Sequence, residues 1–197
     1  MTSDSSIYPS SDMNTTHIYQ LQYRFSDYMK IAMIVAMDRD GCIGKGNGLP
    51  WRLSSDMARF KRLTEADGFN SVVMGRRTWE SLPDRFRPLP ERVNIVMSRD
   101  TDWDDEGAIT ALYVGRAIEI AFAEGSDECW IIGGAQIYEM FMDRVEEIHL
   151  TEVQTNDSGD VYFPKWDRSL WSRELIETVG TDEDNDYDST YSIWTKS

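Results

Sequence analysis

Two glycine-containing segments have the composition of phosphate-binding turns. Met74-Gly75-Arg76-Arg77-Thr78 and Ile132-Gly133-Gly134-Ala135 each follow an apolar run and precede a helical pattern. A helix N-terminus presents unpaired N–H groups and a positive dipole, and glycine lets a phosphate approach the backbone. Two such turns indicate a dinucleotide site, although glycine also serves ordinary turns through its dihedral freedom. No G-x-G-x-x-G segment occurs, so this is not the Rossmann fingerprint.

Asp56 is the carboxylate best placed for catalysis. It falls in the first turn of a predicted helix over residues 56–66, with Phe60 one turn later on the same face. In a pocket lined by Leu53, Met57 and Phe60, burial would raise its pKa and it would face a protonatable nitrogen heterocycle. The alternative is an acidic side chain that only stabilises the helix dipole. The local sequence leaves both readings open.

A glycine-rich segment at residues 41–48 ends at Leu49-Pro50-Trp51. The apolar end would anchor the segment, while its glycines would let it move as a lid over a site. An ordinary long loop is the alternative.

The elements that must position these groups alternate between strand and helix, which favours an α/β fold in a single domain. Residues 30–37 are almost continuously apolar, as in a strand buried on both faces. Ser54 and Ser55 predict a helix N-cap. Further strands are predicted at residues 71–74, 93–97, 129–132, 148–153, 171–179 and 189–195, and further helices at 76–82, 117–123 and 135–142. The last two strands suggest an antiparallel hairpin that turns at residues 182–186.

Composition excludes several classes of function. The net charge is −15, which argues against nucleic-acid binding. Residues 1–99 carry 14 basic and 11 acidic side chains, whereas residues 100–197 carry 6 and 24. An anionic ligand of this acidic protein would therefore need a local basic pocket. The arginines of the first half could form one, and the alternative is that they are simply solvated.

His17 and His149 lie far from other possible metal ligands in the sequence, so no metal site is expected. Two cysteines, Cys42 and Cys129, predict reduced thiols in a cytoplasmic protein, and no apolar run predicts a membrane span.

Taken together, these motifs resemble the dihydrofolate reductase family. The resemblance covers residues 30–196 and rests on five motifs in the family's order. They are Ile34-Val35-Ala36 with Ile43-Gly44, Leu49-Pro50-Trp51, Asp56 and Phe60-Lys61; residues 73–81; residues 87–92 with 94–99; Ile132-Gly133-Gly134 with Tyr138; and Leu150-Thr151, Gly159-Asp160 and Phe163-Pro164. The implied fold is α/β, with an eight-stranded, mostly parallel sheet flanked by about four helices.

The resemblance implies NADPH-dependent reduction of 7,8-dihydrofolate to tetrahydrofolate, by hydride transfer to C6 and protonation at N5. Asp56 would hold N3 and the 2-amino group of the pterin, and Trp51 and Thr151 would order the surrounding water and hydrogen bonds. The implied substrate-binding residues are Ile34, Met57, Phe60, Leu82, Leu89 and Arg92, the last of which would bind the α-carboxylate of the glutamate tail. The implied cofactor-binding residues are Ala36, Ile43, Gly44, Asn47, Gly48, Leu49, Gly75, Arg76, Arg77, Thr78, Ser98, Arg99, Ile132, Gly133, Gly134, Ala135, Gln136, Ile137 and Tyr138.

Two segments depart from the family pattern. Residues 1–28 have no counterpart in it, and are interpreted as a disordered extension or a start codon assigned too early. Pro83-Asp84-Arg85-Phe86 lengthens the turn before Arg87. The alternatives are a related riboflavin-pathway pyrimidine reductase, which would not need Asp56, Phe60 and Arg92 together, and a non-catalytic nucleotide-binding protein. A monomer is expected.

Overall fold

The computed structural model describes residues 29–46, 48–67, 69–156 and 159–197. The predictions for residues 1–28 and for Asn47 therefore lie outside the described residues. Among the described residues, none of the helices has the length and hydropathy that a membrane span requires.

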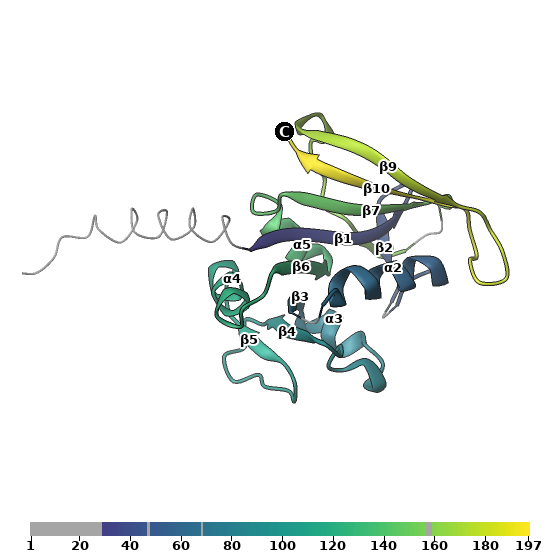
Figure 1. Ribbon diagram of the computed structural model, residues 1–197. Helices are drawn as coiled ribbons and strands as arrows, with labels where there is room; N and C mark the ends of the chain where they lie inside the picture. Colours follow the sequence, from purple (N-terminus) through teal and green to yellow (C-terminus); the bar gives the residue numbers. More distant parts are fainter. Residues whose placement is uncertain (1–28, 47, 68, 157–158) are drawn as a thin grey trace, which may run out of the picture.

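One large sheet organises the described residues. Its order is β5-β4-β3-β6-β1-β7-β10-β9, which Figure 1 shows from β9 at the top to β5 at the bottom. The strands are β1 (Lys30–Asp38), β3 (Asn70–Gly75), β4 (Arg92–Met97), β5 (Ile109–Ala111), β6 (Glu128–Gly133), β7 (Glu147–Val153), β9 (Trp171–Val179) and β10 (Ser189–Lys196). All neighbours from β5 to β7 pair in parallel, whereas β10 is antiparallel to both β7 and β9. The predicted eight-stranded, mostly parallel sheet is confirmed.

Helices cover both faces of this sheet. The helices are α2 (Ser54–Glu65), α3 (Arg76–Ser81), α4 (Val114–Ala123) and α5 (Ala135–Phe141). Side chains of α4 and α5 pack with one set of strand residues, whereas α2 and α3 contribute to a second apolar cluster. Strand β1 supplies both, with Met33 in the first cluster and Ile34 in the second. Alternate side chains of a strand point to opposite faces, so α2 and α3 lie on the face opposite to α4 and α5.

Several short elements have no counterpart among the predicted ones. Strands β2 (Cys42–Gly44) and β8 (Val161–Tyr162) pair antiparallel and form a separate two-stranded sheet. The inserted turn forms the 3₁₀ helix η1 (Asp84–Phe86), and η2 (Arg168–Leu170) leads into β9. Their few residues give too short a pattern to detect in the sequence.

The predicted serine N-cap of α2 is wrong. The helix begins at Ser54, and its N-cap is Leu53, whose side chain makes no capping bond. Instead, Asn185 from the loop between β9 and β10 accepts hydrogen bonds from the Ser55 backbone N–H at 3.2 Å and from its hydroxyl at 2.8 Å. Leu53 also forms an isolated β-bridge with Asn185. The acceptor for the Ser55 N–H at this helix end comes from a residue 130 positions away, so local capping signals could not predict the cap.

Candidate active site

The site lies at the carboxyl ends of the parallel strands, where open α/β sheets bind their ligands. Strands β1, β3, β6 and β7 end at this edge of the sheet. Helix α2 follows β1 and β2 in the sequence. Asp56 occupies the first turn of α2, as predicted. The loop between β9 and β10 fixes this helix end, since the Ser54 N–H donates to the carbonyl of Asp184 at 3.1 Å.

Asp56 is held by two donors at one oxygen. Thr151 Oγ1 in β7 donates to Asp56 Oδ1 at 2.5 Å, and Arg59 Nη1 donates to the same oxygen at 2.9 Å. The Asp56 side chain is only 16 % exposed. Burial raises the pKa of Asp56, because water no longer solvates its charge, while the contacts with Thr151 and Arg59 act in the opposite direction. The result is a carboxyl group whose proton affinity is raised, as proton transfer near neutral pH requires.

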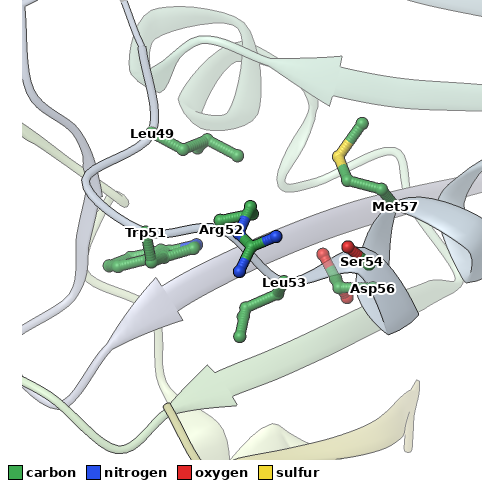
Figure 2. Close-up of a pocket in the computed structure, with 7 residues that line it drawn as sticks. All are labelled: Leu49, Trp51, Arg52, Leu53, Ser54, Asp56 and Met57. Carbon is green, nitrogen blue, oxygen red and sulfur yellow. The ribbon is translucent and has the colours of Figure 1, made fainter. Parts of the chain in front are cut away.

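A pocket of about 280 Å³ opens in front of this carboxyl group. Its lining residues are Leu49, Trp51, Arg52, Leu53, Ser54, Asp56 and Met57, which Figure 2 shows as sticks. Leu53 and Met57 were predicted to line it, and Trp51 and Asp56 line it as well. The indole N–H of Trp51 is buried and has no hydrogen-bond partner among the described residues. A buried donor of this kind calls for a water or a ligand acceptor.

The predicted substrate-binding residues lie in three places, which are an apolar cluster, the pocket and the start of β4. Ile34, Phe60, Leu82 and Leu89 belong to the apolar cluster between the sheet and helices α2 and α3. Met57 is half exposed in the pocket. Phe60 does not line the pocket itself, which differs from the prediction, because its ring packs into the cluster.

Arg92 lies at the start of β4 with its side chain only 3 % exposed. It donates to the carbonyl of Pro90 at 2.8 Å, to Thr64 Oγ1 at 2.7 Å and to Glu65 Oε1 at 3.3 Å. Burial lowers the pKa of Arg92, and Glu65 opposes that effect. A guanidinium has five N–H donors, so these three contacts leave enough for a two-pronged bond to a carboxylate.

The two glycine turns lie side by side. Strands β3 and β6 are neighbours, and Met74 pairs with Gly133. A Cβ at Gly134 would lie 3.3 Å from Thr78 Oγ1, and one at Gly75 would lie 3.2 Å from Ile137. The start of each helix therefore touches the other turn, as a shared dinucleotide site requires. Gly133 has φ +115, and a side chain there would also meet the Tyr138 ring at 3.2 Å.

Other predicted cofactor-binding residues lie on β1, β6 and α5. Tyr138 donates from its hydroxyl to the carbonyl of Ile34 at 2.8 Å, which joins α5 to β1. Ala135 and Gln136 line a hollow of about 410 Å³ beside α5. Ile132 packs against the α2–α3 cluster, and Ala36 packs with Trp51 and Leu53.

The predicted phosphate-reading residues are all polar or basic and lie at the ends of β3 and β4. Arg76 is paired with Glu80 at 2.6 Å and with Asp100 at 3.1 Å, so a phosphate must compete with two carboxylates. Ser98 is buried and accepts from the Asp100 N–H at 3.1 Å. Arg99 is exposed, and Arg77 lies in the first turn of α3.

The glycine-rich segment is tied to a second loop. Gly44 in β2 pairs with Val161 in β8, and Ile43 packs against the α4–α5 face of the core. The Gly46 N–H donates to both carboxylate oxygens of Asp160 at 3.1 Å. Gly48 closes a small turn by pairing with Lys45, and Leu49 reaches the pocket. These contacts hold the segment against β8 and beside the pocket.

Four further residues shape the site but were not predicted: Arg59, Glu177, Asn185 and Tyr191. Arg59 could have been detected, because it lies three residues after Asp56 and thus on the same helix face. The other three lie in or beside the C-terminal hairpin, and nothing in the local sequence links them to Asp56.

Comparison with known proteins agrees with this geometry. The family model for dihydrofolate reductase matches residues 30–196. The chain belongs to the dihydrofolate reductase family. The dihydrofolate reductase of Neisseria meningitidis serogroup A is 43 % identical over 143 residues, which cover 73 % of this chain and 84 % of that protein. The Bacillus subtilis dihydrofolate reductase is 36 % identical over 166 residues, which cover 84 % and 94 %. A solved structure, dihydrofolate reductase from Enterococcus faecalis complexed with NADP(H) and RAB-propyl, aligns with TM-score 0.70 and 31 % identity over 85 % of this chain and 96 % of that one.

Membership of the dihydrofolate reductase family confirms the enzyme class that the motifs predicted, an NADPH-dependent reductase of dihydrofolate. The predicted resemblance and fold are confirmed by the same matches. The two alternatives, a pyrimidine reductase and a non-catalytic nucleotide-binding protein, are set aside.

Proposed function

We propose that this chain reduces 7,8-dihydrofolate to 5,6,7,8-tetrahydrofolate with NADPH, in support of one-carbon and thymidylate metabolism, and that Asp56 is the residue on which the reaction depends. The observation that carries the proposal is the Asp56 carboxyl group, which lies in the first turn of α2 and lines a mostly apolar pocket. Burial raises its pKa. A spectrophotometric assay of NADPH consumption with dihydrofolate tests it, and absence of turnover would overturn it.

Substrate binding follows from the positions of polar and apolar groups. Asp56 Oδ1 is engaged by Thr151 and Arg59, so Oδ2 is the oxygen offered to the pocket. A pterin edge has adjacent N–H donors at N3 and the 2-amino group, which suit a carboxylate acceptor. Leu53 and Met57 supply apolar contacts in the pocket, and Arg92 binds the α-carboxylate of the glutamate tail.

Protonation at N5 uses a water molecule. The buried N–H of Trp51 orients that water, while Asp56 stabilises the positive charge that develops on the pterin. Thr151 fixes the Asp56 carboxylate from β7. Leu49 and the tethered glycine-rich segment exclude bulk water from this side of the pocket.

The residues around the two glycine turns fit NADPH. Their adjoining helix starts suit a pyrophosphate, and the basic and hydroxyl groups at the ends of β3 and β4 suit a 2′-phosphate. When bound, NADPH supplies the hydride that C6 of the pterin accepts. Gly133, Gly134 and Tyr138, whose ring lies beside Gly133, would hold its pyrophosphate and nicotinamide side.

We expect wild-type enzyme to prefer NADPH to NADH, and the double variant Arg76→Ala with Arg99→Ala to lose most of that preference. In this strongly acidic protein, both arginines would balance the negative charge of the 2′-phosphate that NADPH has and NADH lacks. The alanines of the double variant cannot. The ratio of kcat/KM for the two cofactors measures the effect. Arg116→Ala, an exposed arginine on α4, is the matched control and should keep the preference. Equal use of both cofactors by the wild type would contradict this.

We also propose that residues 29–197 form the catalytic domain and that residues 1–28 are dispensable. The family match begins at residue 30, so residues 1–28 lie outside the part of the chain that matches the family. A chain starting at Met29 should keep its melting temperature and turnover. Insoluble or inactive protein would refute this proposal.

We propose that the protein is a monomer, and light scattering tests that state. Cys42 and Cys129 are buried and unpaired, which supports a reducing, cytoplasmic environment.

A further inference from the structure

Arg59 is an almost fully enclosed cation in direct contact with Asp56. Its side chain is 4 % exposed, between α2 and the C-terminal hairpin. Besides its bond to Asp56 Oδ1 at 2.9 Å, Nη1 lies 3.3 Å from Thr151 Oγ1, and Nη2 donates to Glu177 Oε2 in β9 at 2.5 Å. The guanidinium also stacks over the Tyr191 ring of β10, 4.2 Å from its centroid. Four side chains thus fix its position.

The ring beneath Arg59 is fixed in turn by a buried polar chain. The Tyr191 hydroxyl is hydrogen-bonded to Nδ1 of His149 at 2.6 Å, and Nε2 of His149 contacts Glu147 at 3.1 Å. Lys30 pairs with Glu147 at 2.6 Å. The charge of Arg59 therefore cannot swing away from Asp56 without breaking this packing.

We propose that Arg59 is a positioning residue that directs Asp56 Oδ2 into the pocket and sets the pH at which Asp56 and the bound pterin together take up their proton, with Glu177 as its partial counter-charge. This inference rests on the proposed function. Arg59 touches neither the pocket nor the reacting atoms, so it acts only through Asp56.

The direction of the effect follows from electrostatics. A cation near the site disfavours an added proton, whether that proton resides on Asp56 or on the pterin. Arg59 therefore lowers the proton affinity of the pair and opposes the effect of burial on the pKa of Asp56. Because the reaction needs a proton at N5, turnover falls as pH rises through the apparent pKa of the pair. Loss of Arg59 must move this fall to higher pH.

Glu177 should act with the opposite sign. Its carboxylate neutralises part of the Arg59 charge, and its side chain is 51 % exposed, so solvent weakens its own field. When Glu177 is replaced, less of the positive charge of Arg59 is neutralised, so Arg59 lowers the proton affinity of Asp56 and the pterin more strongly. The fall in turnover must then move to lower pH, by a smaller amount.

The other groups that face this cluster do not titrate in the same range. Burial raises the pKa of Tyr191 to about 12 and raises that of Tyr138 further, so both stay neutral at neutral pH. Burial lowers the pKa of His149, which keeps it uncharged there, and Glu147 lies beyond it with its pKa lowered. Arg62 of α2 is exposed, and its charge lowers the pKa of Tyr191 against the larger effect of burial.

The test is the pH dependence of kcat, measured above pH about 6, for Arg59→Gln, Arg59→Lys, Glu177→Gln and Arg62→Gln. Arg59→Gln should move the midpoint of the fall upward by about one pH unit, a tenfold change in proton affinity. Arg59→Lys should restore most of the wild-type midpoint, because it keeps the charge. Glu177→Gln should move the midpoint downward by a few tenths of a unit, and it should fold normally because that side chain is half exposed. Arg62→Gln removes the same charge from an exposed position of the same helix and should leave the midpoint in place.

An unchanged or lowered midpoint in Arg59→Gln would overturn the inference, as would an upward shift in Glu177→Gln or equal shifts in Arg59→Gln and Arg62→Gln. These outcomes differ from failure of the proposed function, in which the wild type itself would not consume NADPH with dihydrofolate. If Arg59→Gln does not fold, the downward shift in Glu177→Gln decides.

Discussion

Asp56→Asn is expected to slow turnover by roughly two to four powers of ten at neutral pH while the protein stays folded. The amide has nearly the shape of the carboxylate, and its oxygen can still accept from Thr151 and Arg59. Its NH₂ group would then face the pocket, where the N–H donors of a pterin need an acceptor. The neutral amide also cannot balance a protonated pterin.

The loss in Asp56→Asn should shrink as pH falls, because the substrate then takes its proton from solvent. Turnover measured across pH, with circular dichroism as the check on folding, gives both results. Asp67→Asn, an exposed carboxylate just beyond α2, is the matched control and should keep wild-type turnover. Near-wild-type turnover of Asp56→Asn at neutral pH would remove Asp56 from the mechanism.

Arg92→Leu is expected to weaken dihydrofolate binding by roughly 2–4 kcal/mol, or about 30- to 1000-fold in Kd, with much less effect on kcat. Leucine removes the fork that binds a carboxylate in two places, and Arg92→Lys should recover only part of the affinity because an ammonium group is a point charge. Binding titrations with dihydrofolate measure the change.

A pterin without the glutamate tail is the control ligand for Arg92→Leu. It should bind the wild type and the variant equally, since it has no carboxylate for Arg92. Arg92 also donates to Thr64 and Glu65, which ties β4 to α2, so a thermal melt must accompany the titration. If both ligands lose affinity to the same extent, Arg92 has a structural role in place of a binding one.

Much of the fold could be predicted because the relevant signals are local. The apolar run at residues 30–37 lies within β1, a strand buried on both faces, and the two glycine turns do join strands to helices. The short strands β2, β5 and β8 were missed, since two or three residues give no period. The predicted serine cap of α2 was wrong because Asn185 supplies the acceptor.

The order of the longer strands and helices and the place of Asp56 in the first turn of α2 could be predicted, because periodicity and turn residues operate over a few positions. The family could be predicted because its motifs follow one another in order along the chain. The groups that surround Asp56 could not be predicted, because they come together only through packing between distant segments. Thr151, Glu177 and Tyr191 are 95 or more positions from Asp56, and they reach this cluster because β7, β10 and β9 are adjacent strands. The charge, burial and proton affinity of the site depend on that strand order, since electrostatic interactions act through space and no local pattern records them.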